Sequence, residues 1–178
     1  MKVRFIIVIF ILLCIPLSWS CKRNHYRINT SSVSADIEIK RLEKDLFSVD
    51  PEEISVRVPI LKEKYGDFLQ VFSYVINTGN VNDSSFGDLL VRFCTDKLNN
   101  EVYASVMQHY PDIKLIEEEM KSAFRHYIWY FPDKKVPAVF TCISGFNSSI
   151  IVSDSALGIG IERYLGSDCE YYPRLEIY

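Results

Sequence analysis

The hydrophobic pattern of the chain changes its period once, at Phe131-Pro132. Upstream, apolar residues recur at helical spacing, and the longest such pattern predicts a helix over residues 113–130. Downstream, the pattern is that of strands, which we expect at residues 136–143, 149–153 and 156–164. The connections between these strands are short, which favours antiparallel neighbours. The chain is therefore predicted to be an α+β protein, with an N-terminal helical bundle followed by a small antiparallel three-stranded sheet.

Local signals place several element boundaries in the helical part. Asp50-Pro51 predicts a helix start, because Asp is a good N-cap and Pro at the next position needs no hydrogen-bond acceptor. Pro59 is expected to kink or split that helix, and Gly66 to end it. Ile37 and Ile39 alternate with polar neighbours and predict a short strand before the helices.

Residues 1–20 are predicted to be a signal peptide rather than part of the fold. Lys2 and Arg4 precede an apolar run of 13 residues from Phe5 to Leu17. As a helix this run would be about 20 Å long, against a hydrocarbon core of about 30 Å. A short apolar run behind a basic flank is typical of a cleaved secretory signal. The alternatives are a buried N-terminal helix or a membrane anchor that stays in place.

The residues from Leu17 to Cys21 are similar to the lipobox of bacterial lipoproteins, with the small Ser20 directly before the cysteine. At such a site the thiol takes a diacylglyceryl group, so Cys21 is the predicted lipid attachment site. Several acyl chains give a stable membrane anchor where one chain gives marginal binding. The alternative for this residue is a plain secreted thiol. Residues 21–35 are polar and are expected to form a lipidated tether ahead of a domain at 36–178.

The charge balance argues against a nucleic-acid partner. The formal net charge is −3, and removal of residues 1–20, with two basic residues and no acidic ones, leaves −5. An acidic chain is poorly suited to the phosphate contacts that dominate nucleic-acid binding. Three cysteines remain in the domain, Cys94, Cys142 and Cys169. One disulfide or three free core thiols are both compatible with this number.

No pattern that carries catalysis or metal binding is recognisable. The sequence has no HExxH motif, and His25, His109 and His126 are far apart. Gly158-Ile159-Gly160 lacks the third glycine and the following helix of a dinucleotide site. These glycines are therefore predicted to allow a close backbone approach or a twisted strand.

Asp154, Glu162 and Asp168 could form a set of carboxylates, but strand alternation does not force them together. We accordingly expect no catalytic residue, no cofactor and no metal site, and a protein that is not an enzyme.

Two stretches in the C-terminal half are specific, YFPDKKVPAVFTCISGFN (130–147) and SDSALGIGIERYLGSDCEYY (153–172). They resemble the GldB family of gliding motility lipoproteins of Bacteroidetes, and IKRLEKDLFSVD (39–50) and LKEKYGDFLQVF (61–72) fit the same family. The resemblance implies a non-catalytic lipoprotein of the cell envelope, anchored by lipid at the periplasmic face of the outer membrane. It also implies a protein partner in the motility apparatus, the linked type IX secretion apparatus or another envelope assembly.

A more distant likeness to zincin-like peptidases leaves a second class of function open. It implies that the chain is the front half of a larger zincin-like fold whose metal site lies beyond residue 178. The apolar end at 171–178 also predicts that structure continues there.

The same end of the chain predicts self-association through residues 156–178. Leu157, Ile159 and Ile161 should share one face of an edge strand, and an exposed strand edge is a pairing site. The aromatic residues Tyr171, Tyr172 and Tyr178 are expected to be available beside that edge.

Overall fold

The sheet is mixed and has four strands within residues 28–175, the part of the chain that the computed structural model describes. The strands are β1 (Ile39–Arg41), β2 (Ala138–Cys142), β3 (Ile150–Val152) and β4 (Ala156–Gly160), in the spatial order β1-β2-β4-β3. β1 and β4 both run parallel to β2, whereas β3 runs antiparallel to β4. The predicted α+β class is confirmed, but the predicted antiparallel three-stranded sheet is wrong.

The sheet differs from the prediction because strands that follow one another in the chain are not all neighbours. Residues 143–149 carry the chain from β2 to the outer position of β3, and the chain then turns back into β4. β4 therefore lies between β2 and β3 and runs in the direction of β2. The fourth strand is β1, where Ile39 pairs with Val139. Alternation along a strand fixes its two faces but not its neighbours.

Helices fill the chain between β1 and β2. They are α2 (Leu42–Phe47), α3 (Pro51–Ile54), α4 (Val58–Tyr65), α5 (Asp67–Val75), α6 (Phe86–Thr95), α7 (Lys97–His109) and α8 (Lys114–Tyr130). After β4 come the 3-10 helix η2 (Ile161–Tyr164) and the short α9 (Tyr171–Arg174). The helix predicted over 113–130 is α8, and the strand predicted over 156–164 ends at Gly160, where η2 begins.

Most boundary signals act as predicted. Pro51 opens α3, and Pro59 lies in the first turn of α4, so the pattern is split into two helices. Gly66 ends α4 with a φ of 52°, a conformation that favours glycine. Asp50 occupies the N-cap position of α3 as predicted, but its side chain makes no cap hydrogen bond, so the expected role of its oxygen is wrong.

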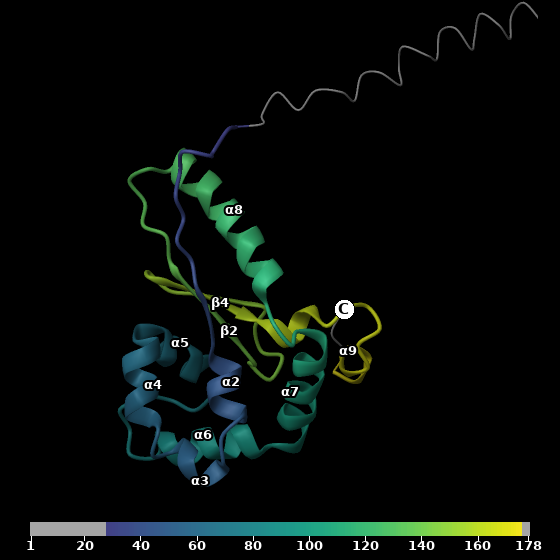
Figure 1. Ribbon diagram of the computed structural model, residues 1–178. Helices are drawn as coiled ribbons and strands as arrows, with labels where there is room; N and C mark the ends of the chain where they lie inside the picture. The colour runs from purple at the N-terminus through teal and green to yellow at the C-terminus, as the bar shows by residue number, and fades with distance from the viewer. Residues whose placement is uncertain (1–27, 176–178) are drawn as a thin grey trace, which may run out of the picture. The chain divides into compact units, whose positions relative to one another are not determined.

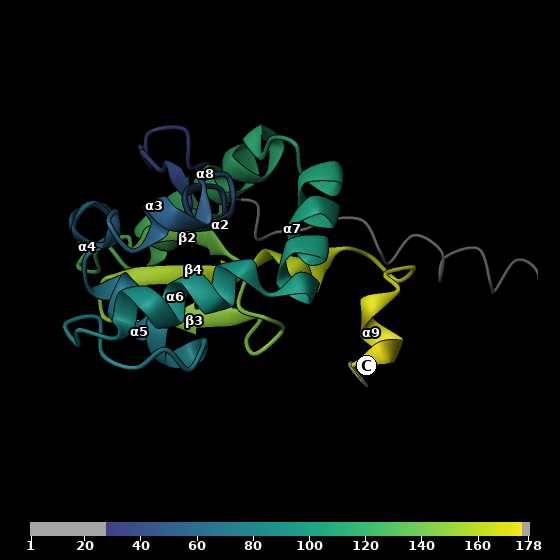
Figure 2. The same cartoon turned by 90° about the horizontal axis from the view of Figure 1, so that it is seen from below.

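One face of the sheet is covered by a helical layer that contains α2, α4, α5 and α6 (Figures 1 and 2). The ring of Phe68 in α5 stacks on the ring of Phe140 in β2, with 4.5 Å between centroids. A Cβ atom on Gly158 of β4 would lie 2.4 Å from the Phe68 ring. The predicted close approach at this glycine is therefore confirmed, and it lets α5 pack directly on the sheet.

The second face of the sheet is covered only in part. Val102 and Val106 of α7 are fully buried in a cluster with Val139 and Ile161. α8 lies on this side of the sheet (Figure 1), but it contains no fully buried residue. Ile116, Met120 and Phe124 are the α8 residues that pack against the cluster. Part of an apolar sheet face therefore stays open.

The chain has two units, Met1–Ser32 and Val33–Tyr178. Of the first unit, residues 28–32 are described, and in them the Ser31 amide donates to Asn29 Oδ1 at 3.0 Å. The predicted signal peptide at 1–20 and Cys21 lie outside the described residues. Among the helices of residues 28–175, none is both long enough and apolar enough to cross a bilayer.

Candidate functional site

Strands β3 and β4 carry an open apolar face. Ile150 and Val152 are 46% and 69% exposed, and Ile159 and Leu157 stand opposite them on β4 and are half-buried. Between the two β3 residues, Ile151 points to the other face and is buried against the helical layer. These four aliphatic side chains, Ile150, Val152, Leu157 and Ile159, are called the open sheet face below.

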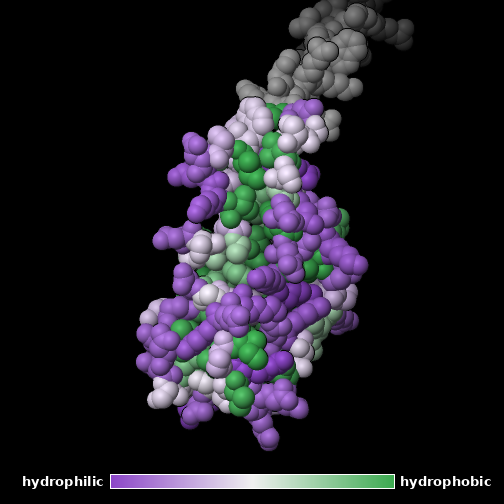
Figure 3. Space-filling model, turned by 60° about the vertical axis from the view of Figure 1, so that its left-hand side comes forward, coloured by the Kyte–Doolittle hydropathy of each residue, from purple (hydrophilic) through white to green (hydrophobic). Residues whose placement is uncertain are grey.

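A groove of about 340 Å³ continues from this face toward α7 and α8. Its walls are mostly apolar and are contributed by Tyr110, Ile116, Thr141, Ile150, Ile159, Ile161 and Tyr164. The hydroxyl of Tyr110 donates to the carbonyl oxygen of Tyr164, which ties the end of α7 to η2. Figure 3 shows apolar side chains gathered between polar rims in the upper part of the domain. An apolar groove with few polar groups suits an apolar side chain of a partner more than a charged substrate.

A buried polar network supports the floor of the groove. The Glu43 side chain is fully buried, and its carboxylate accepts hydrogen bonds from the hydroxyl of Thr141. Arg41 Nε lies 2.5 Å from Glu43 Oε1, and Arg41 Nη1 donates to the carbonyl oxygen of Tyr110 at 2.8 Å. The network therefore joins β1, α2, β2 and the end of α7. Apart from Arg41 Nη2, which is buried and has no hydrogen-bond partner among residues 28–175, the donors and acceptors of the network are used in holding these elements together, which is a structural task.

A second buried carboxylate holds the loop between β2 and β3. Oε1 of Glu162 accepts from the Ser144 hydroxyl at 2.6 Å, from the Ser144 amide at 2.8 Å and from the Phe146 amide at 3.1 Å. Burial raises the pKa of Glu162, and the hydrogen bonds from Ser144 and Phe146 oppose that rise. Oε2 is buried and has no hydrogen-bond partner among residues 28–175. Glu162 therefore fixes the loop from which β3 enters the open sheet face.

The remaining carboxylates and histidines do not gather into a site. Asp154 and Asp168 are exposed, whereas Glu162 is buried, so the three form no common cluster. Within the described part of the chain, no group of three or more His, Cys, Asp and Glu side chains could hold a metal ion. His109 is the last residue of α7, and Nδ1 of His126 lies 2.9 Å from the Ser122 carbonyl oxygen within α8. His25 lies outside the described residues.

The family model of the gliding motility protein GldB matches residues 23–178 of the chain. The chain belongs to the GldB family. No curated protein and no solved structure shows significant similarity to it. The resemblance read from residues 130–147 and 153–172 is thereby confirmed, and GldB is a family of motility lipoproteins that is not known for an enzymatic activity. The more distant zincin likeness gains no support from the fold or from a solved structure.

The structure corrects the expected association surface of this GldB-family chain. β4 is paired on both sides, to β2 and to β3, so it is not an edge strand. Tyr171 is buried and packs on Phe146, with 6.1 Å between ring centroids. The Tyr172 hydroxyl donates to the Glu162 carbonyl oxygen at 3.1 Å. Tyr171 therefore belongs to the core, the half-buried Tyr172 packs against it, and Tyr178 lies outside the described residues.

The three cysteines of the domain are free thiols. Cys94 and Cys142 are buried, and Cys169 is half-buried. Burial raises the pKa of Cys94 to about 12, which keeps the thiol protonated and unreactive at neutral pH. Of the two alternatives left open by the sequence, the structure has the core thiols rather than a disulfide.

Proposed function

We propose that the chain is a non-catalytic, lipid-anchored lipoprotein of the cell envelope, which acts by binding a protein of the gliding motility apparatus or of a linked envelope assembly. The lipid is carried by Cys21, and the protein sits at the periplasmic face of the outer membrane. Membership of the GldB family supports the link to motility. The family membership and the apolar run before Cys21 both support the anchor.

The open sheet face carries the proposal that the protein acts by binding. Val152 is 69% exposed and Ile150 46% exposed, although both belong to a paired strand of a well-packed sheet. Contiguous apolar surfaces of this kind mark sites of protein interaction. The groove beside it offers a concave seat of about 340 Å³ for an apolar side chain of the partner.

No observation on the described residues favours the alternative, the N-terminal half of a zincin-like metallopeptidase with its metal site beyond residue 178. Such an enzyme would hold its metal through ligands beyond residue 178.

The experiment that tests the proposal places a photo-crosslinking amino acid at position 152 of the full chain in its own cell envelope. We expect an adduct whose added mass is that of a different envelope protein. Position 56 is the matched control, because Val56 is equally apolar and 76% exposed but lies between α3 and α4. Adducts at both positions alike, or at neither, would contradict the proposal, and an adduct of exactly twice the chain's own mass would indicate a second copy instead.

A further inference from the structure

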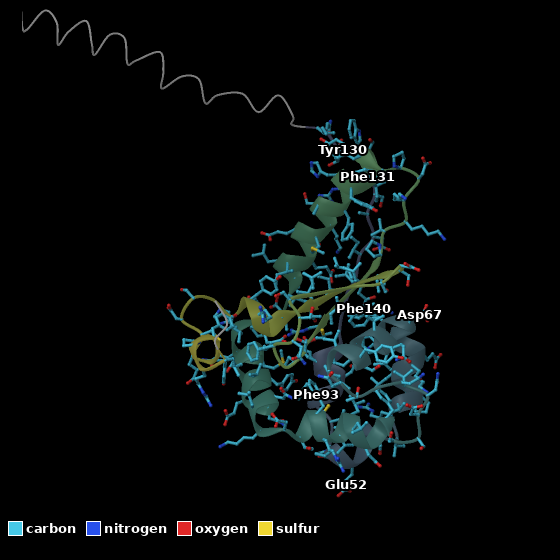
Figure 4. The ribbon with its side chains drawn as sticks, turned by 180° about the vertical axis from the view of Figure 1, so that it is seen from behind. Glu52, Asp67, Phe93, Tyr130, Phe131 and Phe140 are labelled. Atoms are coloured by element: carbon cyan, nitrogen blue, oxygen red, sulfur yellow. The ribbon has the colours of Figure 1, made fainter. Side chains whose placement is uncertain are left out.

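The end of α8 carries a cluster of exposed aromatic side chains. Trp129, Tyr130 and Phe131 are 48%, 52% and 53% exposed. They pack on one another, with ring centroids 5.0 Å apart for Trp129 and Tyr130 and 6.4 Å apart for Tyr130 and Phe131. Figure 4 shows Tyr130 and Phe131 at the end of α8, far from Glu52 in the helical layer. We call Trp129, Tyr130 and Phe131 the aromatic tip.

The charge along α8 and the turn that follows it changes sign toward the tip. Residues 114–124 carry three acidic and two basic residues, whereas residues 125–135 carry Arg125, Lys134 and Lys135 against Asp133. Lys134 and Lys135 are exposed directly beside the aromatic tip. Trp and Tyr prefer the headgroup region of a bilayer, and lysine and arginine are attracted to anionic lipids. Exposed aromatic side chains next to lysines are therefore better suited to the surface of a bilayer than to water.

The chain enters the domain at this end of α8. Residues 33–39 run beside the helix, with Ile37 and Ile39 buried, and the Ile39 amide donates to Glu117 Oε2 at 3.2 Å near the start of α8. An extended chain rises about 3.3 Å per residue and a helix about 1.5 Å. The six residues from Ile39 back to Val33 therefore cover about the same length as the 13 helical residues that follow Glu117. That arithmetic brings Val33 level with Tyr130, and Figure 1 shows the same course of the segment.

The predicted anchor is close to this point in the chain. Cys21 precedes Val33 by 12 residues, which span at most about 43 Å when fully extended. A lipid on Cys21 therefore keeps Val33, which lies level with the aromatic tip, within about 43 Å of the bilayer. A protein partner could bind the tip anywhere on the domain, whereas a bilayer contact requires the tip to lie near the lipid anchor. The position of the tip therefore favours a bilayer as its partner.

We propose that the aromatic tip is a second membrane contact, in which Trp129, Tyr130 and Phe131 insert into the headgroup region of a bilayer that contains anionic lipids. The proposal rests on the lipid anchor of the proposed function and goes beyond it. Stable membrane binding generally takes two signals. A lipid anchor with a second contact elsewhere in the chain fixes the orientation of the domain as well as its distance from the membrane. Lys134 and Lys135 then face the lipid phosphates.

Trp129 itself reports on this contact. The full chain, purified from membranes with its own N-terminus, is reconstituted into vesicles of phosphatidylethanolamine and phosphatidylglycerol at 3:1, with and without phosphatidylcholine brominated at carbons 6 and 7. The sequence has two tryptophans, Trp19 and Trp129, so the signal lost in Trp129→Phe isolates the second. We expect bromine to lower the Trp129 emission at least twofold.

Matched variants locate the effect. Phe131→Asp should at least halve the quenching, whereas Val56→Asp, at a site of greater exposure in the helical part of the domain, should leave it unchanged. Thermal melts of both variants serve as the control for folding. An absence of bromine quenching overturns the proposal. Quenching by iodide, an aqueous quencher, would then show that Trp129 faces water, and protection from iodide would show that protein covers it.

The mass of the N-terminal peptide separates this test from the proposed function. An acylated Cys21 without quenching supports the lipid anchor and overturns the membrane contact of the aromatic tip. Quenching without acylated Cys21 supports the tip and overturns the anchor.

Discussion

The hydroxyl of Thr141 lies 3.1 Å from Glu43 Oε1 and 2.9 Å from Oε2, so one side chain of β2 bridges both oxygens of a fully buried carboxylate. Arg41 supplies the compensating charge at 2.5 Å. A buried charge of this kind is tolerated only while its partners remain, since taking a carboxylate out of water is costly. The open groove thus has a floor whose stability depends on three side chains from three elements.

Removal of one partner should therefore destabilise the domain strongly. We expect Arg41→Ala to lower the free energy of unfolding by about 3–5 kcal/mol, because it leaves the Glu43 charge buried without compensation. Thr141→Val should cost about 1–3 kcal/mol through the lost hydroxyl donor. Urea denaturation measures both changes.

An exposed ion pair provides the control for these variants. Lys97 and Glu101 are 3.8 Å apart, and their side chains are 91% and 43% exposed. Glu101→Ala should change the stability by less than about 1 kcal/mol. Equal losses in the buried and the exposed variants would contradict the assigned role of the network.

Glu162 should make the stability depend on pH in an unusual direction. Its pKa in the folded state is raised, chiefly by burial, so the folded protein holds this proton more tightly than the unfolded chain does. The stabilisation is therefore fully present below the ordinary glutamate pKa of about 4.3 and is lost as pH rises through the folded value. Between those two pKa values the unfolding free energy falls with pH by at most about 1.4 kcal/mol per pH unit, the limit for one proton.

Comparison with Glu162→Gln isolates this contribution. The difference in unfolding free energy between the wild type and this variant should fall as pH rises from about 4, as measured by urea denaturation at several pH values. A difference that stays constant with pH would mean that Glu162 titrates alike in the folded and unfolded states.

Sequence patterns predicted the elements of this fold better than their arrangement. The alternation at Ile37 and Ile39 predicted a strand, and β1 is found at Ile39–Arg41. β1 pairs with β2, and Ile39 lies beside Val139. These segments are 100 residues apart in the chain, and the periodicity of each strand does not predict which strand it pairs with. The periodicity likewise does not predict that β4 lies between β2 and β3.

The site was less accessible to sequence reasoning than the fold. Arg41, Glu43 and Thr141 come from separate segments, and no spacing links them. Glu162 did leave a signal, since it follows the apolar run ALGIGI and so stands where a core residue is expected. A charged residue in such a run indicates a buried carboxylate with its own hydrogen-bond partners.

Cys21 remains the predicted lipid attachment site. Radiolabelled palmitate should enter the wild-type chain and be absent from Cys21→Ser, because acyl transfer needs the thiol. The variant Cys169→Ser is the control, since Cys169 is the most accessible thiol among the described cysteines. Equal labelling of the wild type and Cys21→Ser would show that the lipid, if any, is attached elsewhere.

The last prediction concerns the contact between α5 and the sheet at Gly158. A Cβ atom there would lie 2.4 Å and 2.6 Å from two atoms of the Phe68 ring and 3.2 Å from Ile151 Cβ. Phe68 is 1% exposed and stacks on Phe140, so its ring has no free space into which it could move. Gly158→Ala should therefore lower the unfolding free energy by about 1–3 kcal/mol, as overpacking of a dense core does. Phe68→Leu removes the atoms that clash, so the double variant Gly158→Ala with Phe68→Leu should be more stable than the sum of the two single losses predicts. Strict additivity of the two losses in urea denaturation would show that the glycine is needed for a reason other than the approach of Phe68.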